Sequence, residues 1–249
     1  MKLNNIVKNL NKNSKNLKLK QINYLLSKNI IDKHYITQLI HGISLDLKNE
    51  VTVNNEKELI TYSYFVAGTV GIMMAKILKA EELVAFKYAV DLGIAFQLTN
   101  ITRDILEDAN INRIYIPKSW MRLNRDQIKS PSCRDKVKLK KITRKLLNMS
   151  EKYYKSALKG LAFLSFRNRF AILLALIIYR QIGIKIIRKS FSNINKREKV
   201  NFFEKLFCIL KCLIIFSFKI EIHKKNFKHD KSLHKYIKTF LLIKNKNVK

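Results

Sequence analysis

Helix-breaking residues are scarce throughout this chain. Its 249 residues include only 6 Gly and 2 Pro, and both prolines, Pro117 and Pro131, lie near the middle. Tight turns and hairpins depend on such residues, so few can form here. The runs between them are long, and their apolar residues recur at helical spacing. These features predict an all-α protein, and the length favours one domain with a substantial core.

The pattern divides the chain into a lead-in and one helical domain. Residues 1–20 are rich in lysine and contain no acid, so we expect a basic, loosely ordered lead-in, followed by a single domain over 21–249. Helices are expected near 21–30, 34–47, 59–78, 82–109, 138–164, 169–189 and 198–222, with a loop at 130–133, a short terminal helix and no strand of useful length. The apolar runs at 170–179 and 212–218 are shorter than the roughly 20 residues that span a bilayer, which favours a soluble or peripheral protein.

The charge balance is strongly basic, with 50 Lys+Arg against 18 Asp+Glu and a net charge of +32. Such a charge is typical of nucleic-acid binding. Lysine is spread along the whole chain, however, so we favour compositional drift and expect no nucleic-acid partner. A basic surface would favour peripheral contact with anionic lipid headgroups. Cys133, Cys208 and Cys212 show neither metal-site spacing nor a disulfide framework, which favours the reducing cytoplasm.

Acid is concentrated at one place in this basic chain. Asp104, Glu107 and Asp108 fall within five residues, on a segment that otherwise resembles a buried helix. At helical spacing a single stripe, flanked by bulky apolar residues, is formed by Gly93, Gln97, Asn100, Asp104 and Asp108. A solvated face would not have apolar flanks. The stripe is therefore expected to line an interior cleft.

The residue types on this stripe suit a hard metal ion. Mg²⁺ prefers oxygen ligands, which Asp104, Asp108 and Asn100 offer, and it is often shared with substrate phosphates. Donors for a diphosphate are available from Arg103, Arg113 and Tyr115. The alternative is an ordinary capping and salt-bridge cluster near a helix C-terminus, although the helix dipole disfavours acid there.

A second feature is the small-residue face of Ala67, Gly68 and Gly71. A glycine inside a helix costs about 1 kcal/mol relative to alanine, so such a face usually makes room for a backbone or a ligand. Close helix–helix packing is the commoner reason.

Two segments carry a family resemblance: YSYFVAGTVGIMMAKIL, and DLGIAFQLTNITRDILEDANINRIYIPKSWM. They resemble the squalene/phytoene synthase family, and bacterial phytoene synthases in particular. The resemblance covers about residues 22–190. It implies an all-α isoprenoid-synthase (terpenoid synthase) bundle around a central cavity, in which two aspartate-rich motifs face each other and bind Mg²⁺, or alternatively Mn²⁺, and prenyl diphosphates.

The resemblance also implies roles for particular residues. Asp104 and Asp108 match the metal-binding aspartates of the second motif. Diphosphate and metal support is implied for Gln97, Asn100 and Arg103, a flap over the diphosphate for Arg113 and Tyr115, and the lining of an apolar prenyl tunnel for Tyr62, Val66, Ala67, Val70 and Tyr179. The implied catalytic group is Asp104, Asp108, Arg103 and Tyr115.

The chain departs from the family pattern at its N-terminal end. The first aspartate-rich motif should lie well upstream of LIHGISLDL, yet Asp32 is the only acid in the first forty residues. Asp46 and Glu50 have similar spacing, but they belong to the aligned LIHGISLDL region and are not assigned to that motif. The chain therefore resembles a synthase lacking its first helices, and a separate N-terminal polypeptide would be a partner.

The family reaction joins two prenyl diphosphates head to head. We expect Mg²⁺-dependent condensation of two geranylgeranyl diphosphates into phytoene, for carotenoid biosynthesis, through a cyclopropyl diphosphate. The alternatives are a squalene- or dehydrosqualene-type synthase, and a truncated, non-catalytic homologue that acts as a binding protein.

Overall fold

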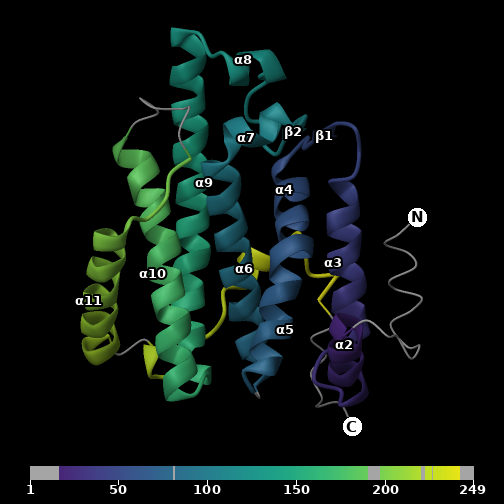
Figure 1. Ribbon diagram of the computed structural model, residues 1–249, viewed down its shortest axis with the longest axis vertical. Helices are drawn as coiled ribbons and strands as arrows, with labels where there is room; N and C mark the ends of the chain where they lie inside the picture. The colour runs from purple at the N-terminus through teal and green to yellow at the C-terminus, as the bar shows by residue number, and fades with distance from the viewer. Residues whose placement is uncertain (1–16, 81, 190–196, 220–221, 226, 242–249) are drawn as a thin grey trace.

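A computed structural model describes residues 17–80, 82–189, 197–219, 222–225 and 227–241, and this part forms a bundle of long helices (Figure 1). The elements in chain order are α2 (Leu17–Ser27), α3 (Lys33–Leu45), β1 (Val51–Thr52), α4 (Glu56–Ser63), the π-helical turn η1 (Tyr64–Gly68), α5 (Thr69–Ile77), α6 (Leu83–Arg103), α7 (Ile105–Asn110), β2 (Arg113–Ile114), α8 (Arg125–Lys129), α9 (Cys133–Gly160), the 3-10 turn η2 (Leu161–Phe163), α10 (Phe166–Arg188), α11 (Phe202–Phe218) and the 3-10 turn η4 (Lys231–His234). The all-α prediction is confirmed.

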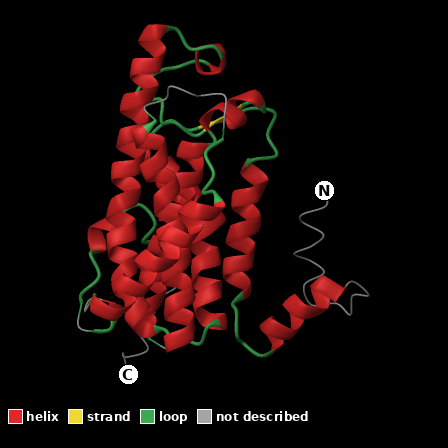
Figure 2. Ribbon diagram, turned by 60° about the vertical axis from the view of Figure 1, so that its left-hand side comes forward, coloured by secondary structure: helices red, strands yellow, loops and turns green. Residues whose placement is uncertain are grey.

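Helix α6 lies at the centre of the bundle. It packs against α9 on one side and against α5 and η1 on the other. Helix α10 packs on both α6 and α9, α11 lies outside α10, and α3 packs on the opposite flank against η1 and α5 (Figure 1). Helix α2 extends from the foot of the bundle (Figure 2), where Ile22, Leu25 and Leu26 pack on a small cluster around Ile31 and Ile36.

Glycines allow the central helices to approach closely. A Cβ atom on Gly93 would lie 2.3 Å from the carbonyl oxygen of Ala67, and one on Gly71 would lie 2.2 Å from that of Ala89. Both obstacles are backbone atoms, which cannot move aside. The small-residue face of η1 and α5 therefore allows close helix–helix packing, the commoner of the two reasons considered for it.

Several predicted boundaries were wrong. The expected helix at 82–109 is divided, because Asp104, at φ −104° and ψ 17°, leaves the helical region between α6 and α7. Helix α9 begins five residues earlier than expected, where Ser132 accepts a hydrogen bond from the backbone N–H of Asp135. Helix α11 is shorter than expected and begins at a capping box formed by Asn201 and Glu204.

Two further expectations need correction. Helix α2 includes residues 17–20 of the expected loose lead-in, while residues 1–16 lie outside the described part of the chain. A parallel pairing of Val51 with Arg113 and of Thr52 with Ile114 was also not expected. It is too short to show alternation, and it anchors the segment after α7 beside the segment after α3.

Two helical stretches, Glu56–Ile77 and Phe166–Arg188, are long and apolar enough to cross a membrane. The core helices of a soluble protein can have the same length and composition. The apolar windows of the two stretches are 50% and 33% buried inside the bundle. The expectation from the run at 170–179 was wrong on length, because α10 extends beyond that run on both sides.

The segment at 227–241 packs across the back of the central helices. Three tyrosine hydroxyls donate to its carbonyl oxygens: Tyr88 to Phe227 at 2.9 Å, Tyr153 to Leu233 at 2.9 Å, and Tyr64 to Phe240 at 3.2 Å. The ring of Phe240 also packs against that of Phe65, with centroids 4.9 Å apart. These contacts make the late segment part of the core.

Candidate active site

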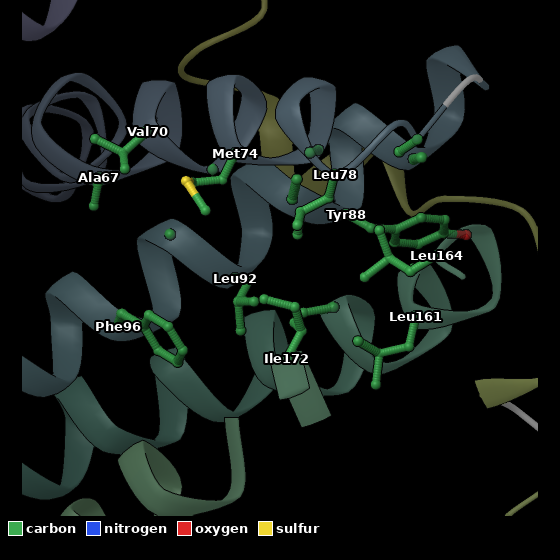
Figure 3. Close-up of a pocket in the computed structure, with 18 of the residues that line it drawn as sticks. Ala67, Val70, Met74, Leu78, Tyr88, Leu92, Phe96, Leu161, Leu164 and Ile172 are labelled. Atoms are coloured by element: carbon green, nitrogen blue, oxygen red, sulfur yellow. The ribbon is translucent and has the colours of Figure 1, made fainter. Parts of the chain in front are cut away.

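An apolar cavity of about 350 Å³ lies beside α6. Figure 3 shows Ala67, Val70, Met74 and Leu78 on one wall, with Leu92, Phe96, Leu161 and Ile172 on the other. Four of the predicted tunnel residues line it, namely Val66, Ala67, Val70 and Tyr179. The fifth, Tyr62, is absent from this lining and borders a separate hollow with Tyr115. Four of the five are thus brought together around one apolar space.

The polar stripe of α6 forms one edge of this cavity. Gly93, Gln97 and Asn100 all line it. The Asn100 Oδ1 atom is buried and has no hydrogen-bond partner among the described residues. A buried polar atom without a partner costs free energy, so its presence indicates a group that ligand or metal could satisfy. Asp104 follows one helical turn later, outside the apolar lining.

Asp104 is held by two arginines. Arg103 donates to its two carboxylate oxygens at 2.7 and 2.6 Å, and Arg197 donates to the same oxygens at 2.7 and 3.0 Å. Burial alone raises the pKa of Asp104, but the hydrogen bonds from Arg103 and Arg197 outweigh it, and the pKa falls below its ordinary value. Asp104 is therefore a carboxylate at neutral pH, within a salt-bridge cluster of the kind considered as an alternative.

Asp108 has the opposite environment. Burial, followed by the negative charge of Asp104, raises its pKa to about 7, and the smaller effect of Arg113 lowers it only in part. The backbone N–H of Asp108 still donates to the Asp104 carbonyl oxygen at 2.8 Å, so the two residues stay one turn apart across the helix break. A carboxyl group whose pKa is raised in this way binds a cation readily, because the cation offsets the repulsion between the two negative charges.

Asp46, at the end of α3, is the third acidic residue here, and Asp46, Asp104 and Asp108 are together called the acid-rich site. Its carboxylate accepts hydrogen bonds from Tyr115 at 2.7 Å and from Tyr62 at 2.9 Å, and the two tyrosine rings are stacked with centroids 4.7 Å apart. Burial is the main cause that raises the pKa of both tyrosines, which remain neutral donors. Arg113 donates to the Asp46 carbonyl oxygen at 2.9 Å. The pairing of β1 with β2 brings these partners together.

Sequence reasoning missed two residues of this site. Asp46 was set aside because its segment aligned away from the first motif, although an acid in that segment was a usable signal. Arg197 lies in the lysine-rich late part of the chain, where nothing distinguished it from its neighbours. The helix-dipole argument also needs correction, since Asp104 starts α7 as well as ending α6. Acid at a helix start is favourable.

The residues present fit a hard divalent cation. Asp104 and Asp108 supply carboxylate oxygens, Asn100 supplies an oxygen without a partner, and Asp46 lies close enough to raise the pKa of Asp108. Around them Arg103, Arg113 and Arg197 supply guanidinium groups suited to phosphate oxygens. This combination of oxygen ligands and arginines, at the rim of an apolar cavity, suits a molecule with a phosphorylated head and a hydrocarbon tail.

Comparison with known sequences agrees with this chemistry. The chain matches the squalene/phytoene synthase family profile over residues 2–204. It is 37% identical to a 15-cis-phytoene synthase of Pantoea ananas over 179 residues, and 36% identical to one of Enterobacter agglomerans over 175 residues. These matches cover 71% and 69% of this chain, but only 57% and 58% of the relatives. The matched part thus spans little more than half of each relative.

Comparison with solved structures confirms the fold. A dehydrosqualene synthase superposes with a TM-score of 0.74 at 22% identity, covering 87% of this chain and 77% of that one. Squalene synthase HpnC from Alicyclobacillus acidocaldarius superposes with a TM-score of 0.65 at 14% identity, covering 76% of this chain and 72% of that one. The bundle is therefore an isoprenoid-synthase fold, and the chain belongs to the squalene/phytoene synthase family.

Proposed function

We propose that this chain carries the catalytic part of a phytoene synthase, which condenses two geranylgeranyl diphosphates head to head. The observation that carries the proposal is the junction of the apolar cavity with Asn100, Asp104 and Asp108 at its polar rim. The identity to two 15-cis-phytoene synthases supports the choice of substrate and product. The reaction would pass through a cyclopropyl diphosphate.

Each group at the rim has a distinct task in this proposal. The diphosphate would accept hydrogen bonds from Arg103, Arg113 and Arg197, in place of the contacts that two of them now make with Asp104. Tyr115 and Tyr62 would remain neutral donors beside Asp46. The apolar walls would hold the prenyl chains and keep water away from a carbocation, which water would otherwise trap.

Mg²⁺ is the proposed metal, and Mn²⁺ would serve as an alternative with the same oxygen preference. Asn100, Asp104 and Asp108 would hold it. When bound, the ion would neutralise diphosphate charge and so favour its departure. Because Asp108 must lose its proton to act as a ligand, binding would strengthen as pH rises through about 7.

A further segment is proposed to cover the open side of the cavity. Val70 and Met74 line the cavity, yet they are 37% and 44% exposed. Apolar walls exposed in this way would admit water during the reaction. A segment carrying the family's first aspartate-rich motif, on this polypeptide or a separate one, would close this side and supply the facing carboxylates.

The test is product formation from geranylgeranyl diphosphate with Mg²⁺. The chain would be assayed alone, and also co-expressed with the part of the Pantoea ananas relative that it does not match. Phytoene should form in at least one of these, and Asp104→Ala should lower the rate roughly 10³-fold, as expected for loss of a transition-state electrostatic contact. Asp126→Ala, at an exposed carboxylate, is the matched control. If the folded chain forms no phytoene, either alone or with the co-expressed part of the relative, the proposal is refuted.

A squalene-type reaction is the second candidate, because the solved relatives by fold are dehydrosqualene and squalene synthases. The same assay with farnesyl diphosphate separates the two. A clear preference for the shorter substrate would replace the phytoene assignment while leaving the roles of Asp104 and Asp108 unchanged.

We also propose that the protein works in the cytoplasm, at a membrane surface. The outer face of α11 leaves large apolar side chains exposed, including Phe203 at 78%, Phe207 at 62% and Phe218 at 81%. Lysines on the same helix and the net charge of +32 complement anionic headgroups. The purified chain should co-sediment with phosphatidylglycerol-containing vesicles, and the double change Phe203→Ser and Phe207→Ser should weaken this binding. Equal recovery of wild type and variant with the vesicles would refute the role of α11.

A further inference from the structure

A buried polar cluster lies on the far side of α6 from the cavity. Asp91 is fully buried, and the side chains of His229 and His234 are only 4% and 7% exposed. The Nε2 atom of each histidine lies 2.8 Å from a different carboxylate oxygen of Asp91. Asp91 precedes Gly93 by two residues, about 200° around the helix, which separates the cluster from the polar stripe. The cluster is thus distinct from the acid-rich site.

The charge of Asp91 lacks a permanent counterpart. Its ion-pair partners within the described ranges are the two histidines, and neither a lysine nor an arginine there pairs with it. Ser156 adds a neutral hydrogen bond at 2.6 Å. A buried carboxylate needs a compensating charge as well as hydrogen bonds. A metal ion held by the two imidazoles and the carboxylate would supply that charge without a lysine or an arginine.

The three ligand atoms are already gathered around one point. One oxygen of Asp91 and one nitrogen from each histidine all lie within 4.8 Å of one another, and the centroids of the two imidazole rings are 4.3 Å apart. A tetrahedral ion with bonds of about 2.0 to 2.2 Å separates its ligands by about 3.3 Å. The two contacts at 2.8 Å reach different oxygens of Asp91. Around one shared oxygen, the short contact would therefore open by about half an ångström, and the longer separations, at most 4.8 Å, would close by rotation of the side chains.

We propose that Asp91, His229 and His234 bind one divalent transition-metal ion, with Zn²⁺ as the expected ion. Two imidazoles and one carboxylate suit this class of ion, whereas Mg²⁺ prefers oxygen ligands alone. On binding, each ring proton on Nε2 leaves or moves to Nδ1 so that the nitrogen lone pair can reach the metal. The ion joins the segment at 227–241 to α6, and so acts as a structural clamp behind the active site.

Metal content and a cobalt spectrum test the proposal on the full chain without an affinity tag. After treatment with a chelator, the protein should take up one equivalent of Zn²⁺, and Co²⁺ should give the visible absorption of a tetrahedral site. A hundredfold excess of Zn²⁺ over its Kd should raise Tm by about 5 to 10 °C. Excess Mg²⁺ should not displace the cobalt.

Variants then locate the ion. His234→Asn and Asp91→Asn should abolish the cobalt spectrum, whereas His41→Asn, at an exposed histidine, and Asp104→Asn, in the other site, should keep it. A wild-type chain without a cobalt spectrum and without a Zn²⁺-dependent rise in Tm overturns the proposal, whatever the variants do. Retention of the full spectrum by folded His234→Asn would also overturn it.

Discussion

Asp91 lies within α6 and Asp104 directly after its last residue, thirteen positions later, yet their surroundings differ in kind. Asp91 is enclosed by the core and accepts hydrogen bonds from three groups that need carry no charge, Ser156 and two histidines. Asp104 lies where α6 ends, and it is held by two arginines that we propose to bind the diphosphate. The enclosed carboxylate ties the late segment to α6, and the other is proposed to serve the reaction. The two carboxylates thus differ in their partners and in the roles that we propose for them.

The difference in stability is the largest expected effect. Asp91→Ala leaves a serine and two histidines unpaired in the core, and should lower the free energy of unfolding by about 3 to 5 kcal/mol, or Tm by roughly 10 °C. Asp104→Ala, whose partner Arg197 is half exposed, should cost only about 1 kcal/mol. Thermal unfolding followed by circular dichroism measures both. Equal falls in Tm for the two variants would contradict the contrast.

The glycine face beside the cavity should be the next most sensitive feature. Gly93→Ala places a Cβ against the Ala67 carbonyl and should cost about 3 kcal/mol, because the central helices must separate. Gly183→Ala is the matched control, since its nearest neighbour is the side chain of Leu147 at 3.0 Å, which can turn aside. Denaturant midpoints compare the two variants. If Gly183→Ala lowered the midpoint as much as Gly93→Ala does, the close approach of the central helices would not be the cause of the destabilisation.

The smallest expected effect is a pH dependence that comes from Asp108. Its pKa in the folded chain is about 7, above the ordinary 3.8, so the folded state holds an extra proton between these values. The free energy of unfolding should therefore fall as pH rises from about 4 to 7, by on the order of 1 to 2 kcal/mol after solvent screening. Unfolding in urea at pH 5 and pH 8 measures it.

A variant sharpens this prediction. Asp108→Asn should remove the pH dependence and should be the more stable protein at pH 8. Asp104→Asn should keep the dependence but shift it to lower pH, because the charge that repels Asp108 is gone. An unchanged pH profile in Asp108→Asn would assign the effect to another group.

The sequence predicted the fold more completely than the site. Helical periodicity and the scarcity of glycine and proline identify the bundle, because they act locally. The polar stripe of Gly93, Gln97 and Asn100 was likewise readable from spacing along one helix. Spacing could not reveal that the helix ends at Asp104, or that Arg197, 93 residues later, pairs with it.

The contributions of Asp46 and His234 were hidden for the same reason. Asp46 reaches Tyr115 across 69 residues, and His234 reaches Asp91 across 143. A pattern within one helix contains no information about such pairs. Only the packing of the bundle, which depends on many weak contacts at once, determines which distant side chains meet.

The packing of residues 227–241 across the central helices has a consequence for how the protein is made. Tyr64 finds its partner Phe240 after 176 further residues have been synthesised. Until then, part of the surface of η1, α6 and α9 has no cover, and contacts this distant in sequence form slowly. A growing polypeptide therefore passes through a period in which its helices exist but its core is open. Chaperones that bind nascent apolar surface would have their main opportunity during that interval.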